Sequence, residues 1–228
     1  TAADVKKLRE MTSVGMMDCK KALTEADGDF DKAIELLREK GLAKAAKKAD
    51  RIAAEGLVKA TVCDECGVGA IIEVNSETDF VAKNADFQQF VSDVANVVIK
   101  DAPADVEALK ACKMGEGTVQ DALQEKVLTI GENLQIRRFE RFDNSTVNVA
   151  YNHMGGVIGV LVGLEVSEGL KDNATVKELG KDIGMQAAAM NPSFLDKSDV
   201  DEATLAKEKE ILLIQALEEN KTAAKPKP

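Results

Sequence analysis

Thr78-Asp79-Phe80-Val81-Ala82-Lys83-Asn84 follows an apolar run and precedes an amphipathic helical pattern, so this stretch joins a strand to a helix. Its central pair places a carboxylate beside an aromatic ring. The chain has only 7 Phe, 1 Tyr and no Trp, so a ring within a polar segment needs an explanation. The residues alone leave two interpretations open. Either Phe80 folds onto the protein's own core and Asp79 caps a helix, or both side chains contact a partner protein.

A hairpin pattern leads into this stretch. Alternating apolar residues predict strands over Leu57–Cys63 and Val68–Val74, and the polar segment Asp64–Gly67 between them suits a hairpin turn. After the stretch, Asn84 is placed to cap a helix. The buried face of that helix is predicted to carry Phe87, Phe90, Val91, Val94, Val97 and Val98.

The same order of elements returns later in the chain. The pattern predicts a strand over Thr146–Tyr151, a glycine-rich turn over His153–Gly156, a strand over Val157–Val166 and a helix over Asn173–Met190. Between these halves, a helix is expected from Thr118 to Gly131, followed by a strand over Leu134–Glu140. The repeated order predicts a duplicated α+β unit whose halves pack side by side.

Three short helices are predicted before the first strand. The first begins with a capping box of Thr1 and Asp4, the second spans Met16–Glu25, and the third starts after Asp29 and ends at Gly41. Residues 42–56 form a further helical stripe, which we interpret as a separate linking helix. Its cations are expected to form a solvated face; they are Lys44, Lys47, Lys48 and Arg51.

One more helix is predicted near the C-terminus. Asn191-Pro192 ends the helix before it, and Asp199 or Asp201 can cap a helix over Glu202–Glu218. The apolar residues of this helix are suited to pairing with another helix. The polar tail Lys221–Pro228 is expected to be mobile.

Composition excludes several classes of protein. A formal net charge of −10 and a pI of about 4.8 argue against direct nucleic-acid binding, which relies on a surplus of Lys and Arg. No apolar run reaches the roughly 18 residues of a membrane span, and the N-terminal residues lack the apolar core of a signal peptide. The 4 Cys are expected to be free thiols. The sequence therefore predicts a cytoplasmic protein.

Chemistry within the chain is not expected. Cys63-Asp64-Glu65-Cys66 has the spacing of a zinc or redox motif, but no second pair of ligands exists and the motif falls in a predicted hairpin turn. A turn with two incidental thiols is the favoured interpretation. A single His excludes most catalytic triads, and no GxxxxGK[ST] phosphate loop is present. We therefore expect no metal site, no cofactor and no nucleotide bound by this chain itself.

The string VKKLREMTSVGMMDCKKALTEADGDFDKAIELLREKG, Val5 to Gly41, resembles the N-terminal module of the bacterial elongation factor Ts family. The TDFVAKN stretch and the string from Ile130 to Arg138 resemble the same family. The resemblance implies an α+β fold: a three-helix bundle similar to ubiquitin-associated domains, then a core of two related subdomains and the start of a helical hairpin. The expected segments are 1–41, 42–56, 57–145, 146–198 and 199–228.

The resemblance also implies which residues contact the partner, elongation factor Tu. The exchange loop carries Asp79 and Phe80 together with Thr78, Val81, Lys83 and Asn84. The N-terminal docking residues are Arg9, Met16, Met17, Lys20 and Lys48. The second core half contributes Ile158, Gly159 and Gln186. Some family members carry a histidine at the place of Gln186.

The family's long form is implied to continue beyond the last residue of this sequence with a returning helix and further strands. The completeness of the second half and self-association therefore stay open. The implied function is nucleotide exchange: the chain binds elongation factor Tu carrying GDP and promotes GDP release, while Mg²⁺ and nucleotide belong to the partner. Two other classes are weighed against it. They are a ubiquitin-associated-like adaptor, which needs only the first module, and a thiol oxidoreductase, which needs Cys63 and Cys66.

Overall fold

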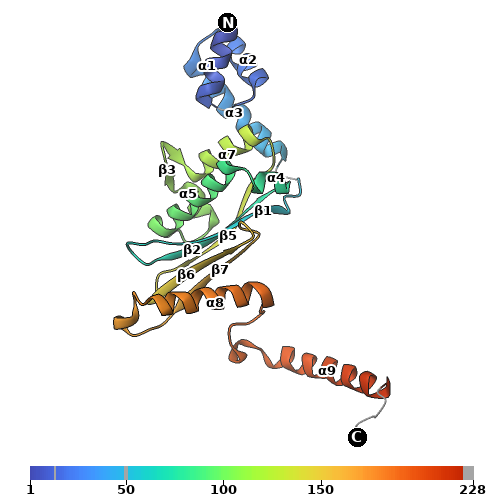
Figure 1. Ribbon diagram of the computed structural model, residues 1–228. Coiled ribbons are helices and arrows are strands. Elements are labelled where there is room, and N and C mark those ends of the chain that lie inside the picture. The colour runs from blue at the N-terminus through green and yellow to red at the C-terminus, as the bar shows by residue number, and fades with distance from the viewer. Residues whose placement is uncertain (13, 49–50, 223–228) are drawn as a thin grey trace. The chain divides into compact units, whose positions relative to one another are not determined.

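A computed structural model describes residues 1–12, 14–48 and 51–222, without the side chains of residues 42–48 (Figure 1). The protein divides into two compact units. The first unit spans Thr1–Ala189 and the second Met190–Pro228. The predicted α+β fold class is confirmed. No helix in these described ranges is long and apolar enough to cross a membrane.

Three helices form the N-terminal bundle: α1 (Ala2–Thr12), α2 (Met16–Glu25) and α3 (Phe30–Lys48). The expected caps are present, since Asp4 accepts a hydrogen bond from the Thr1 hydroxyl at 2.6 Å and Asp29 accepts one from the backbone N–H of Asp31 at 3.0 Å. The buried core consists of small and medium side chains: Leu8, Val14, Cys19, Ala22, Leu23, Ala26, Ala33 and Leu37.

The predicted end of the third helix at Gly41 is wrong. Helix α3 continues to Lys48, so the helical part of the predicted linking helix belongs to α3. Gly41 lies where α3 packs beside the helix that carries Leu128: a Cβ at Gly41 would lie 3.4 Å from the Leu128 side chain. Gly56, expected to close the linker, lies instead in strand β1 (Glu55–Val62).

The first core sheet has three antiparallel strands in the order β1-β2-β5, with β2 at Gly69–Ser76 and β5 at Gln135–Phe142. Helix α5 (Ala85–Asp101) covers one face of the sheet (Figure 1). Because side chains alternate along a strand, Ala70, Ile72 and Val74 share a face, and all three belong to the buried cluster that includes the helix residues Phe87, Phe90, Val91, Val94 and Val98.

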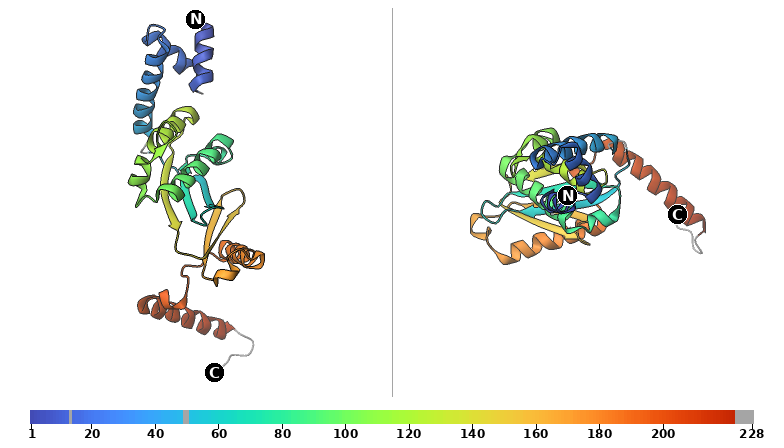
Figure 2. Two further views of the ribbon diagram at one scale, coloured as in Figure 1. Left: turned by 90° about the vertical axis from the view of Figure 1, so that its left-hand side faces the viewer. Right: turned by 90° about the horizontal axis from the view of Figure 1, so that it is seen from above.

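A second hairpin, β6 (Val147–His153) with β7 (Ile158–Leu164), packs on the other face of the sheet. The contact is close because glycines remove side chains there: a Cβ at Gly69 would meet Leu161 at 2.8 Å. Helix α8 (Ala174–Met190) then packs on this hairpin through Gly180 and Gly184, and Figure 2 shows it end-on in the left view. The predicted order of hairpin and helix thus occurs twice.

Several short elements escaped prediction. They are α4 (Asp79–Ala82), α6 (Val106–Ala111), β3 (Lys113–Met114), β4 (Gly117–Thr118) and two 3-10 turns at Glu168–Leu170 and Lys197–Asp199. Each has too few residues to show a hydrophobic period. The predicted helix α7 (Val119–Ile130) is confirmed, with a capping box of Thr118 and Asp121 and with Gly131 at φ 88° after its end.

The second unit contains helix α9 (Glu202–Thr222), somewhat longer than predicted. Asp201 is its cap, since its carboxylate accepts a hydrogen bond from the backbone N–H of Thr204 at 2.9 Å. Leu212, Leu213 and Ile214 on this helix are exposed. The final residues of the predicted tail, 223–228, lie outside the described part of the chain.

Candidate partner-binding site

The Thr78–Asn84 stretch folds as a helical turn and not as an open loop. Asp79–Ala82 form the single turn of α4 between β2 and α5. Val81 is buried in the core cluster, while Phe80 is 78% exposed. The interpretation that Phe80 folds onto its own core is therefore wrong. The turn uses one apolar side chain as an anchor and leaves the aromatic ring next to it in solvent.

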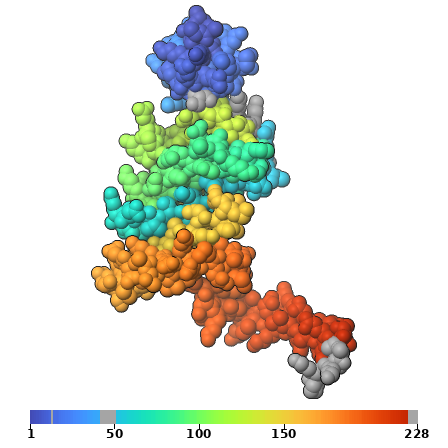
Figure 3. Space-filling view, viewed as in Figure 1, coloured from blue at the N-terminus to red at the C-terminus, as the bar shows by residue number. Residues whose placement is uncertain are grey.

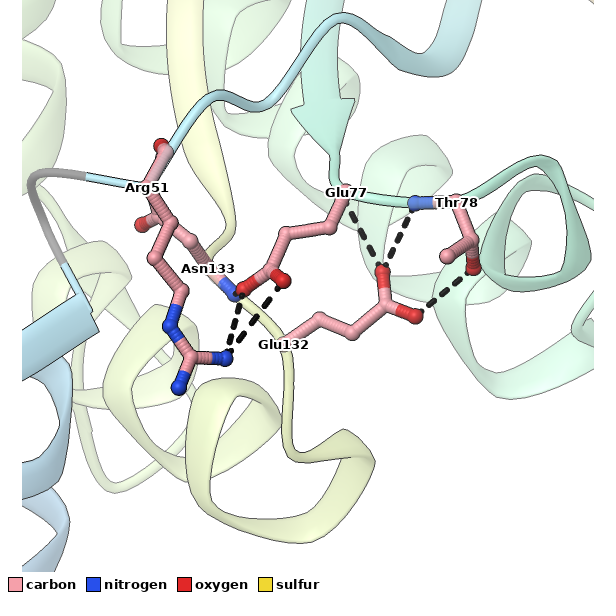
Figure 4. Close-up of polar contacts among 5 residues, drawn as sticks. All are labelled: Arg51, Glu77, Thr78, Glu132 and Asn133. Carbon is pink, nitrogen blue, oxygen red and sulfur yellow. Dashed lines mark hydrogen bonds and ion pairs between the residues drawn. The ribbon is translucent and has the colours of Figure 1, made fainter.

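The N-terminal side of this turn is held by the carboxylate of Glu132, which follows α7. One carboxylate oxygen accepts hydrogen bonds from the backbone N–H groups of Glu77 and Thr78, both at 3.0 Å, and the other accepts the Thr78 hydroxyl at 2.7 Å (Figure 4). The buried Ser76 hydroxyl donates to the backbone oxygen of Thr78 at 2.9 Å. The backbone leading into the turn is thus fixed by side chains.

A second carboxylate completes this arrangement. Glu77 accepts the backbone N–H of Asn133 at 2.6 Å, and a nitrogen of Arg51 lies 3.5 Å from both Glu77 oxygens (Figure 4). The Asn133 side-chain amide donates in turn to the backbone oxygen of Arg51 at 2.8 Å. Three segments far apart in sequence therefore meet at the start of the turn.

Asp79 points to a cation on its own turn. The Lys83 ammonium lies 2.7 Å from the Asp79 carboxylate and 6.0 Å from the centroid of the Phe80 ring. The hydrogen bond and positive charge of Lys83 lower the pKa of the Asp79 carboxyl. Asp79 is therefore a carboxylate at neutral pH, and both groups of this ion pair are solvent-exposed.

The C-terminal side of the turn is also fixed. The Asn84 side chain accepts the backbone N–H groups of Asp86 at 2.8 Å and Phe87 at 3.2 Å, which confirms Asn84 as the cap of α5. The Gln88 amide donates to the Ala82 backbone oxygen at 3.0 Å. With both ends held, the position of Phe80 follows from the fold of the core.

The predicted docking residues lie on the surface of the bundle. Met16 and Met17 are 45% and 63% exposed at the start of α2, and Arg9 and Lys20 are exposed as well. A shallow groove of about 410 Å³ includes Met17 and Lys20 in its lining, together with Lys21, Thr24, Glu25 and Lys40. The side chain of Lys48 lies outside the described residues.

The residues predicted in the second half differ in character. Ile158 and Gln186 are exposed, whereas a Cβ at Gly159 would lie 2.6 Å from the Val58 side chain. Gly159 therefore lets β7 approach β1.

A hollow of about 440 Å³ is lined by residues of β1, α5 and the β6–β7 turn, and Figure 3 shows the green surface of α5 beside the yellow surface of that hairpin.

Cys63 and Cys66 lie in the β1–β2 turn, as predicted, and all four cysteines are free. The backbone N–H of Cys66 lies 3.2 Å from the Cys63 sulfur. Hydrogen bonding from Cys66 lowers the pKa of the Cys63 thiol. Within the described ranges, no group of three or more His, Cys, Asp or Glu residues is arranged to hold a metal ion.

Comparison with known proteins identifies the family. The family model described as "Elongation factor TS" matches residues 77–226, a range that includes the whole Thr78–Asn84 stretch. Elongation factor Ts of Clostridium perfringens is 52% identical over 97% of this chain and 73% of its own length. The chain belongs to the elongation factor Ts family. The elongation factors Ts of Clostridium kluyveri and Clostridioides difficile are 53% and 50% identical, over 72% and 73% of their own lengths.

The sequence did not indicate the residues that hold the start of the turn. Glu132 and Asn133 fall in the string that resembles elongation factor Ts, yet nothing in their spacing indicates that Glu132 binds Thr78 or that Asn133 binds Glu77 and Arg51. Polar residues after a helix are ordinarily interpreted as a turn, so Gly131-Glu132-Asn133 alone does not indicate these contacts. The contacts of Glu77 and Arg51 carried no sequence signal.

Proposed function

We propose that this chain is a guanine nucleotide exchange factor of translation elongation, which binds elongation factor Tu carrying GDP and promotes GDP release. The observation that carries the proposal is the exposed Phe80 ring on a turn whose two ends are fixed by the core. An exposed ring costs free energy in water, so a rigid exposed ring suits insertion into a partner. Family membership supports the choice of that partner.

Exchange on this proposal is a coupling of two binding equilibria. The factor and the nucleotide each lower the other's affinity for the GTPase by the same factor, so no bond is made or broken by this chain. The GTPase holds GDP through phosphate-loop amides and a hydrated Mg²⁺ ion. Phe80 is proposed to wedge between partner helices near that ion, and Asp79 to disturb its hydrogen-bonded surroundings. Mg²⁺, GDP and GTP belong to the partner.

The remaining predicted residues are proposed to bind and orient the partner. Met16 and Met17, with Arg9, Lys20 and Lys48, dock the N-terminal bundle on the nucleotide-binding domain. Ile158 and Gln186 provide contacts from the second half, and Gln186 does so without a cationic form. The net charge of −10 supports a protein partner over nucleic acid. A cytoplasmic location follows from the same proposal.

The test is release of labelled GDP from purified elongation factor Tu, with and without this chain. We expect acceleration by the wild-type chain and loss of most of it in the double variant Asp79→Ala, Phe80→Ala. Phe80→Ala alone is expected to cost about 2 kcal/mol or more of transition-state stabilisation, the threshold of an interface hot spot. Phe194→Ala removes another partly exposed ring and serves as the matched control. Unchanged GDP release with the double variant would contradict the mechanism.

A further inference from the structure

The start of the exchange turn is held by two carboxylates that work in opposite directions. Glu132 accepts backbone N–H groups of residues 77 and 78, and Glu77 accepts the backbone N–H of residue 133. Each segment thus supplies a side chain that binds the backbone of the other. The paired residues are separated by 54 to 56 positions in the sequence. We call Arg51, Glu77, Thr78, Glu132 and Asn133 the brace.

We infer that Glu132 is a positioning residue for nucleotide exchange, which acts by fixing the direction in which Phe80 leaves the surface. This inference rests on the proposed exchange function. Phe80 lies two residues after Thr78 and one residue before the buried Val81. The backbone of Phe80 is therefore held between the brace on one side and the core on the other.

The Glu132 carboxylate makes several directional hydrogen bonds to one short segment of backbone. Its two oxygens accept three hydrogen bonds, at 3.0, 3.0 and 2.7 Å, all from Glu77 and Thr78. Hydrogen bonds to a charged acceptor are roughly twice as strong as neutral ones. Thr78 has an extended backbone and makes no side-chain cap bond to α4, so its hydroxyl serves the brace and not the helical turn.

Arg51 is the cationic member of the brace. The Arg51 guanidinium lies 3.5 Å from the Glu77 carboxylate and adds a positive charge to the brace. Arg51 is 56% exposed, so this ion pair alone contributes little to stability. The directional bonds of Glu132 are the part of the brace that fixes the turn.

Loss of this support should affect exchange more than docking. In Glu132→Ala the Glu77 and Thr78 amides exchange their fixed acceptor for water, and the turn gains freedom while the bundle is unchanged. We expect the maximal rate of GDP release to fall about tenfold or more, because a misplacement of about 1 Å can cost about a hundredfold. The half-saturating concentration of the chain should change by less than about threefold, since docking contacts are retained.

Glu132→Gln and Thr78→Val should each lower the rate of GDP release less than Glu132→Ala does. In Glu132→Gln the side-chain oxygen can still accept the two backbone N–H groups and the new amide can donate to the Thr78 hydroxyl oxygen, so this variant should recover most of the lost rate. Thr78→Val removes one of the three bonds and should give a smaller loss than Glu132→Ala. Glu125→Ala, an exposed carboxylate on α7, is the control and should release GDP as the wild type does.

The deciding experiment places Glu132→Ala in wild-type and Phe80→Ala chains and measures GDP release from elongation factor Tu at saturation. If Glu132 acts through Phe80, it slows the wild type about tenfold but changes the Phe80→Ala chain by less than about twofold. Equal slowing in both backgrounds, or none in the wild type, would overturn the inference. Amide hydrogen exchange of Glu77 and Thr78 in the free chain should also quicken with Glu132→Ala.

The outcomes separate this inference from the proposed function. Failure of the wild-type chain to accelerate GDP release removes the function itself. Normal acceleration by the wild type and by Glu132→Ala removes only the role of Glu132. Slow exchange with unaltered amide protection at Glu77 and Thr78 also contradicts positioning by the brace.

Discussion

At the scale of single residues, the two phenylalanines on either side of Asn84 differ in burial. Phe87 is fully buried in the first core cluster, whereas Phe80 is largely in solvent. We expect Phe87→Ala to lower the free energy of unfolding by about 3 to 5 kcal/mol and Phe80→Ala to change it by less than about 0.5 kcal/mol. Urea unfolding monitored by circular dichroism measures both. A large loss for Phe80→Ala would show that the ring has a structural role.

Glu73 provides a prediction about pH. Partial burial raises the pKa of its carboxyl, but hydrogen bonds from Arg138, Arg137 and Asn75 outweigh this, and the net shift is downward. Arg137 and Arg138 lie 2.8 and 2.7 Å from the carboxylate. Because the pKa is lowered on folding, the stabilisation is present above the unfolded value of about 4.3 and is lost as pH falls through the folded value.

Glu73→Gln should therefore destabilise the protein by about 1 kcal/mol at pH 7, because Arg137 and Arg138 are largely exposed and solvent weakens their bonds to the carboxylate. The difference from wild type should shrink as pH falls from about 5 toward about 3. Urea unfolding at several pH values measures it. Glu140→Gln, an exposed carboxylate on β5, is the control. A pH-independent difference would argue that Glu73 acts through packing.

At the scale of elements, the second hairpin is hydrogen-bonded to β1. The backbone N–H of Val58 donates to the Gly156 oxygen at 2.8 Å, and the Asn152 amide pairs with both backbone groups of Ala60. Three backbone groups of β1, at Val58 and Ala60, thereby gain hydrogen-bond partners. Gly156 has φ +102°, and a Cβ there would meet the Leu57 side chain at 2.2 Å and the Val58 oxygen at 2.8 Å. Position 156 therefore requires glycine both for its positive φ and for its close approach to β1.

Gly155 is a matched control for Gly156, since it has φ +71° but open space around a Cβ. Gly155→Ala should cost about 1 to 2 kcal/mol of strain. Gly156→Ala should cost about 1 to 3 kcal/mol more, because the added methyl group also clashes with β1. Thermal unfolding of the two variants compares these costs. Equal destabilisation would mean that backbone strain alone explains Gly156.

Elements marked by local signals could be predicted from sequence, and contacts between distant segments could not. The sequence predicts Asn84 as a cap and Thr118 as the start of a helix, and each binds backbone groups within three residues of itself. The predicted helix end at Gly41 is wrong because a glycine is a local stop signal, whereas α3 continues through Gly41 and packs there beside Leu128 of α7. Glu132 escaped for the same reason, since its partners lie 54 and 55 positions away. Phe80 was singled out by its chemistry, but its exposure needed the structure.

At the scale of the whole molecule, the residues proposed for docking and those proposed for exchange lie over two different hydrophobic cores. The N-terminal residues belong to the bundle with its own buried cluster, and the exchange turn belongs to the cluster under α5. We expect a substitution of an exposed side chain on one surface to leave the buried cluster beneath the other surface unchanged. This separation allows affinity and rate to be changed independently, because each effect resides in a separate set of contacts.

Met17→Ala and Phe80→Ala test this division of labour. Met17→Ala should raise the half-saturating concentration of the chain about five- to tenfold, a cost of about 1 kcal/mol, with little change in the maximal rate of GDP release. Phe80→Ala should mainly lower the maximal rate. Because the two residues share no buried cluster, the double variant should show both effects in full, which stopped-flow release of labelled GDP over a range of chain concentrations measures. A double variant no worse than Phe80→Ala alone would mean that docking and insertion are one coupled event.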